Sequence, residues 1–185
     1  MPILTAYEII QLVILSLALG YIFSGFFSFT RDPFKPKKVF DWDAIKFAAI
    51  ISTPAVVFHE FGHKFIAMAF GLSATFFIWP TGLIIGIILK AIGSPFLFLA
   101  PAYVSIPSGA TSLQMALIAL AGPAVNLLLW GISSYLIKTK KNMSEKELIG
   151  WTISKKLNLF LFIFNMIPIP PLDGFSVIKG LFGLF

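Results

Sequence analysis

Four long apolar stretches limit what this chain can fold into. They run over Ile3–Phe29, Ala44–Phe70, Thr111–Ile137 and Leu157–Phe185, and about 20 apolar residues are enough to cross a bilayer. Only 12% of the residues are charged, whereas a soluble globular domain carries about 25%. We therefore predict an all-α, multi-pass integral protein of the cell membrane with about four transmembrane helices.

Two lysine-rich loops, residues 30–43 and 138–156, separate these stretches. The net charge of +6 resides mainly in them. That distribution fits membrane topology better than nucleic-acid binding, so the lipid bilayer is an expected partner and nucleic acid is not. The chain has no cysteine, which excludes disulfides and thiolate metal sites.

The segment between the second and third stretches is harder to interpret. Residues 74–79 are rich in strand formers, residues 80–82 read as a turn, and residues 83–89 could form a second strand. Residues 82–104 have the length of a span but are interrupted by glycine, proline and lysine. We predict a short membrane-embedded β-hairpin or re-entrant segment here. Both lysine-rich loops then lie on one side of the membrane.

The second stretch contains His59-Glu60-Phe61-Gly62-His63. On a helix this spacing puts both imidazoles on one face, one turn apart, where they can hold one zinc ion. Glu60 lies about 100° round the helix and can act as a general base. A lone buried histidine is more often a core residue than a ligand. Here three ionisable groups share an apolar run, where leaving them unpaired costs several kcal/mol, so a hydrolytic zinc site is the better interpretation.

The third zinc ligand can be sought by elimination, because a catalytic zinc usually has three protein ligands. With only two histidines and no cysteine, the third is a carboxylate, unless water or an uncharged oxygen takes that place. Glu8 lies near the N-terminal membrane edge and Glu60 is the expected base. Asp173 remains, in a helix break at residues 165–174; its alternative role is a turn-forming Asp-Gly. The other acidic residues lie in loops: Asp32, Asp41, Asp43, Glu145 and Glu147.

Helix boundaries leave some alternatives open. Pro54 either kinks one long helix or begins a new helix capped by Thr53, and Gly71 is a plausible stop. In the third stretch Asn126 needs a partner inside the bundle, although it could simply join helices. Ser144 has capping-box spacing to Glu147, which suggests a short surface helix.

Three motifs together resemble the site-2 protease family of intramembrane zinc metalloproteases. They are His59-Glu60-Phe61-Gly62-His63, Gly122-Pro123 with Asn126, and Asn165 followed by Pro168, Pro171 and Leu172-Asp173-Gly174. The resemblance covers about residues 44–180. It implies a single protease domain over residues 1–185, with residues 3–29 as an additional helix and without PDZ or CBS modules.

The resemblance also implies roles. His59, His63 and Asp173 would bind one zinc, Glu60 would be the base, and Asn165 would steady the substrate or the oxyanion. The implied substrate is a transmembrane segment of another protein, which pairs in extended form with strands in residues 74–89. We take Asn126, Phe77, Ile78 and Trp79 as substrate-binding residues. The alternatives are a catalytically silent zinc-binding scaffold, which would not need Glu60, and a metal transporter, which would need more ligands.

Membrane orientation has two predictions. The positive-inside rule puts residues 30–43 and 138–156 in the cytoplasm. In the family, the motif helix generally runs toward the cytosol, which puts the same two loops outside. The family orientation is the one we adopt.

Overall fold

The computed structural model describes residues 3–25, 40–94, 101–106 and 109–184. Most of the first lysine-rich loop lies outside these residues. The chain divides into two compact units. The amino-terminal unit comprises residues 2–53 and 77–103, and the carboxy-terminal unit comprises residues 54–76 and 104–185.

The amino-terminal unit contains α1 (Ala6–Ser24) and α3 (Pro80–Ala91). α1 begins with a capping box, in which the Glu8 carboxylate accepts the N–H of Thr5 at 2.9 Å. The predicted turn at residues 80–82 and the strand at residues 83–89 are wrong, because both segments belong to α3. Pro80 stands at the start of that helix, where a missing N–H costs nothing.

A two-stranded sheet joins β1 (Thr75–Ile78) to β2 (Ala102–Ser105). The predicted strand after the motif helix is therefore confirmed, but its partner lies further along the chain. The Trp79 N–H donates to the carbonyl of Pro101 at 2.8 Å, and the Phe77 ring stacks on Tyr103. Residue 79 thus pairs with residue 101, and residue 77 pairs with residue 103. The numbers rise along one strand as they fall along the other, so the strands are antiparallel.

α2 (Trp42–Ala69) is a single helix with Pro54 inside it. The alternative of one long helix is thus correct, and Thr53 does not cap a new one. The helix is shared, because its residues up to Thr53 belong to the amino-terminal unit and the rest to the carboxy-terminal unit. It ends just before Gly71, whose φ of 76° suits a glycine stop.

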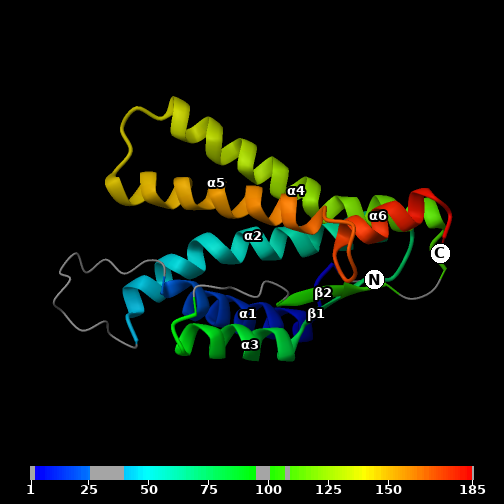
Figure 1. The fold of residues 1–185 in the computed structure, drawn as a ribbon, viewed down its shortest axis with the longest axis horizontal. Coiled ribbons are helices and arrows are strands. Elements are labelled where there is room, and N and C mark those ends of the chain that lie inside the picture. Colours follow the sequence, from blue (N-terminus) through cyan, green and yellow to red (C-terminus); the bar gives the residue numbers. More distant parts are fainter. Residues whose placement is uncertain (1–2, 26–39, 95–100, 107–108, 185) are drawn as a thin grey trace. The chain divides into compact units, whose positions relative to one another are not determined.

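Three further helices complete the carboxy-terminal unit: α4 (Ser112–Thr139), α5 (Glu145–Asn165) and α6 (Asp173–Leu181). α4 and α5 run side by side (Figure 1). The capping box of Ser144 and Glu147 is confirmed. However, the helix that it begins is not a short surface helix, because it continues for 21 residues to the predicted break.

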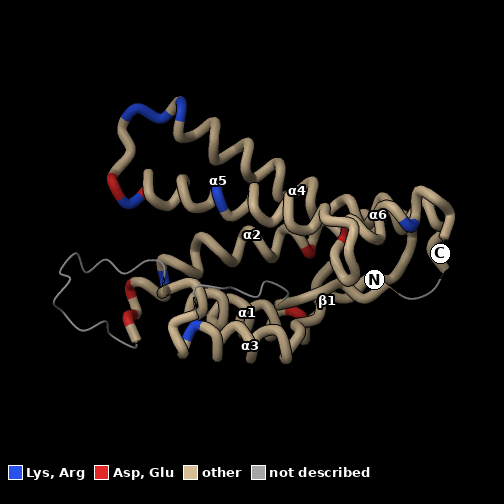
Figure 2. Tube along the Cα trace, viewed as in Figure 1, with Lys and Arg blue, Asp and Glu red and all other residues tan. Residues whose placement is uncertain are grey.

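Among the described residues, three helices, α1, α2 and α4, are long and apolar enough to cross a membrane. The mainly helical class is confirmed. The predicted fourth span, residues 157–185, is not one long helix, because it comprises the end of α5 and the nine-residue α6 with a break between them. Neither helix meets this measure. Figure 2 shows charged residues around the turn between α4 and α5, whereas α4 is uncharged up to Lys138.

Candidate metal centre

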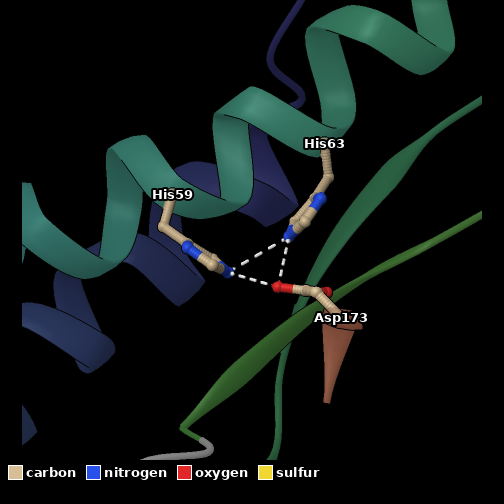
Figure 3. A group of neighbouring side chains, drawn as sticks. All are labelled: His59, His63 and Asp173. Carbon is tan, nitrogen blue, oxygen red and sulfur yellow. Dashed lines mark hydrogen bonds and ion pairs between the residues drawn. The ribbon is translucent and has the colours of Figure 1, made fainter. Parts of the chain in front are cut away.

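Two imidazoles of α2 form one side of the centre. His59 and His63 are both buried, and their Nε2 atoms lie 3.1 Å apart. Both rings extend from the same face of the helix toward Asp173 (Figure 3). The spacing of four residues therefore produces the side-by-side arrangement expected of a helix.

Asp173 forms the other side, from the first turn of α6. Its Oδ2 lies 3.1 Å from His59 Nε2 and 3.4 Å from His63 Nε2. The chain turns tightly before this residue, and a Cβ on the neighbouring Gly174 would collide with the carbonyl of Met166. The glycine of the Asp-Gly pair thus lets the carboxylate reach the histidines.

The protonation of the two rings can be deduced from their outer partners. The Nδ1 of His59 lies 2.6 Å from Asn126 Oδ1, and that of His63 lies 2.7 Å from the carbonyl of Ile118. Both oxygens can only accept, so each ring in its neutral form carries its proton on Nδ1 and has its lone pair on Nε2. Each Nε2 is therefore free to bind a metal.

A cation fits between these three atoms. Two imidazole lone pairs face Asp173 Oδ2, a buried oxygen with no hydrogen-bond partner among the described residues. Lone pairs this close repel one another unless a positive charge lies between them. Ligands bound 2.0–2.1 Å from a tetrahedral zinc are about 3.3 Å apart. The observed separations of 3.1 to 3.4 Å match this value.

The electrostatics of Asp173 favour the same conclusion. Burial raises the pKa of its carboxyl, whereas hydrogen bonds and positive charge from His59 and His63, when these rings are protonated in the metal-free protein, lower it below its ordinary value. The carboxylate is therefore ionised at neutral pH, as a zinc ligand must be.

Close packing of α4 against α2 holds the two rings in place. A Cβ on Gly122 would collide with the His63 ring and lie 2.8 Å from Cε1 of His59. α2 also approaches α4 closely at Gly62, where an added Cβ would lie 2.8 Å from the carbonyl oxygen of Ala121. The glycine of the Gly122-Pro123 pair thus makes room for the metal centre.

We expect Gly122→Ala to weaken zinc binding by at least about 10-fold, because the added methyl displaces both ligand rings. Overpacking should also cost about 1–3 kcal/mol of stability. Chelator competition on the purified protein measures the first effect and thermal unfolding the second. Gly131→Ala on the same helix is a matched control, because its Cβ would meet nothing within 4 Å. Equal zinc affinity in the two variants would contradict this account.

The remaining predicted site residues have definite places but untested roles. Glu60 is buried on α2 between the two histidines in sequence. Asn165 is the half-buried last residue of α5. Phe77 and Ile78 belong to β1, and Trp79 is the N-cap of α3. All three lie in the amino-terminal unit, and their role in substrate binding stays a prediction.

Asn126 has a contact that the sequence did not specify. Its predicted role in substrate binding stays a prediction, and in this structure its side chain contacts His59. Asn158 of α5, which contacts Asn126, was not predicted at all. A signal was present, since Asn158 is an uncharged polar residue in the apolar run of residues 157–164, as Asn126 is in its own stretch.

Comparison with known proteins agrees with this chemistry. A protein of Methanocaldococcus jannaschii is 37% identical to this chain over 177 residues, which are 93% of this chain and 83% of the relative. Its name is “putative zinc metalloprotease”. The chain belongs to this zinc metalloprotease family.

Other zinc metalloproteases of the same description match shorter regions. One from Synechocystis is 32% identical over 134 residues, covering 72% of this chain and 30% of the relative. Another, Rip2 of Mycobacterium tuberculosis, is 28% identical over 143 residues, covering 65% of this chain and 51% of the relative. No family model and no solved structure matches this chain. As a zinc metalloprotease, the chain is a hydrolase whose cofactor is zinc, and His59, His63 and Asp173 are the group that could hold it.

Proposed function

We propose that this chain is an intramembrane protease of the site-2 type. It hydrolyses peptide bonds within or near transmembrane segments of other membrane proteins, in the manner of regulated intramembrane proteolysis. The observation that carries the proposal is the position of the metal centre. Two of its three ligands belong to α2, and their outer partners belong to α4, and both helices are long and apolar enough to cross a membrane. A metal centre inside such helices suits a substrate that is itself in the bilayer.

The chemistry assigned to the side chains is that of a zinc hydrolase. His59, His63 and Asp173 would hold the zinc, which when bound would lower the pKa of water and polarise a carbonyl. Glu60 takes a proton from the attacking water as the water oxygen bonds to the scissile carbonyl carbon. As the C–N bond breaks, Glu60 passes that proton to the leaving nitrogen. The Asn165 amide donates a hydrogen bond to the carbonyl oxygen as negative charge develops on it.

Substrate binding is assigned to the small sheet. A helical peptide bond is shielded, so the substrate has to unwind before attack. An unwound segment can recover its lost hydrogen bonds by pairing with a strand edge. β1, with Phe77 and Ile78, supplies such a strand after the motif helix.

Cleavage in proteoliposomes tests the proposal. The substrates are a single-span membrane protein and an unfolded soluble protein that carries the same sequence outside the bilayer. We expect zinc-dependent cuts within or near the transmembrane segment of the first, which stop when a chelator removes zinc and return when zinc is added. Zinc-loaded protein that cuts only the soluble substrate would overturn the intramembrane assignment. Zinc-loaded protein that cuts neither would favour the silent scaffold.

A further inference from the structure

A chain of buried polar side chains leads away from the metal centre. The Nδ1–H of His59 donates to Asn126, whose Nδ2 donates to Asn158 Oδ1 at 2.9 Å. The Nδ2 of Asn158 donates in turn to the carbonyl of Ser154 at 2.8 Å and also contacts its hydroxyl, which lies 3.1 Å from that of Ser133. These bonds join α2, α4 and α5 within the carboxy-terminal unit.

The hydrogen bonds that Asn126 makes on the side away from His59 determine which way its amide faces. Its two amide hydrogens are both used, one on the carbonyl of Ala55 at 2.8 Å and one on Asn158 Oδ1. The amide oxygen therefore has to face His59. Asn158 cannot turn round either, because its own amide nitrogen is held by Ser154. Each N–H donor in this series of hydrogen bonds, from His59 to Asn126 to Asn158, therefore points away from the metal centre.

A reversed Asn126 would be incompatible with zinc binding. It would present its NH₂ group to His59, which could then pair only by accepting at Nδ1. The ring proton would move to Nε2 and occupy the lone pair that the metal needs. The direction of one buried amide thus controls whether His59 is a ligand.

We propose that Asn158 is a positioning residue for the metal centre. It does not reach the zinc ligands with its own side chain. Together with the carbonyl of Ala55, it holds the Asn126 amide in the direction in which His59 keeps its proton on Nδ1 and offers Nε2 to zinc. Asn126 is fully buried and Asn158 is 1% exposed, so an amide hydrogen that lost its acceptor here would leave an unsatisfied buried group. This inference rests on the zinc centre of the proposed function but not on any substrate.

The experiment measures zinc affinity of full-length protein in detergent by chelator competition. We expect Asn158→Leu to weaken zinc binding by about 10–100-fold, as loss of an outer-shell partner does. Asn158→Asp keeps the acceptor oxygen and should stay within a few-fold of wild type. Ser133→Ala, at the far end of the chain of bonds, should bind zinc as wild type does.

A spectroscopic measurement separates positioning from general destabilisation. The side-chain ¹⁵N resonances of His59 in metal-free protein should report a proton on Nδ1 in wild type and a mixture of both forms in Asn158→Leu. If Asn158→Leu folds poorly, Asn158→Ala replaces it, because alanine also removes the acceptor for the Asn126 amide and introduces no new polar group.

Three results would overturn the proposal. One is wild-type zinc affinity in Asn158→Leu. Another is an unchanged Nδ1–H form of His59 in that variant. The third is an equal loss of affinity in Ser133→Ala. Because no cleavage is measured, the proposal is judged separately from the protease assignment, which fails only if zinc-loaded wild type does not cut membrane substrates.

Discussion

We expect Glu60→Gln to abolish peptide cleavage and to leave zinc bound. The glutamine amide has nearly the same size as the carboxylate but cannot accept the proton of the attacking water. Loss of a general base typically costs about 10²–10⁴-fold in rate. Glu60 is not one of the three residues grouped around the metal position, so zinc content should stay at the wild-type value.

Cleavage rate and zinc content are measured on the same preparation. Glu147→Gln is a matched control, because Glu147 lies on the exposed end of α5 and pairs with Lys140 at 2.7 Å. An exposed ion pair of this kind contributes little stability, so that variant should cleave at the wild-type rate. A Glu60→Gln protein that cleaves as fast as wild type would remove Glu60 from the mechanism.

Replacing Asp173 with alanine should remove most of the zinc. The carboxylate is the one anionic group of the three, and its loss leaves two neutral imidazoles with an open side. Loss of a residue that only hydrogen-bonds to a metal ligand already costs about 10–100-fold in metal affinity. Loss of a direct ligand should therefore cost more. Zinc affinity is again measured by chelator competition.

The control for this variant is Asp43→Ala, in the exposed first turn of α2. It removes a carboxylate from the surface and should leave zinc binding unchanged. If Asp173→Ala binds zinc as tightly as wild type, the third ligand is another group or water, and the elimination that selected Asp173 is wrong.

The residues of the metal centre were predictable from one local pattern and from the scarcity of other possible ligands. The spacing of His59 and His63 places both rings on one helical face wherever the helix lies. Few carboxylates lie inside the apolar stretches, so elimination left Asp173 as the third ligand. The other candidates were expected in loops, but Asp43 lies in the first turn of α2 and Glu145 and Glu147 lie in that of α5. The structure brings these three residues together, although Asp173 lies far from the histidines in sequence.

The segment after α2 was predicted only in part, for a physical reason. Residues 83–89 form a short apolar run, and periodicity alone does not distinguish a buried strand from a buried helix in such a run. Pro80 was interpreted as part of a turn, but it also suits the first position of a helix. The true partner of β1 is β2, which follows α3, and no local pattern encodes a pairing across an intervening helix.

The hydrogen-bond partners of the buried asparagine side chains also could not be predicted from the sequence. An asparagine in an apolar stretch has to find a hydrogen bond, because leaving it unpaired is costly. That rule identifies Asn126 and Asn158 as residues with partners. It does not say that they contact each other, or that one of them contacts His59, because those contacts depend on how α2, α4 and α5 pack.

The zinc content of wild-type protein, purified in detergent without added metal or chelator, shows whether the three residues form a metal centre. We expect close to one zinc per chain, as for one site with three protein ligands. Folded wild-type protein that contains no zinc, and takes up none when zinc is supplied, would contradict this expectation. The group of His59, His63 and Asp173 would then not be a working metal centre.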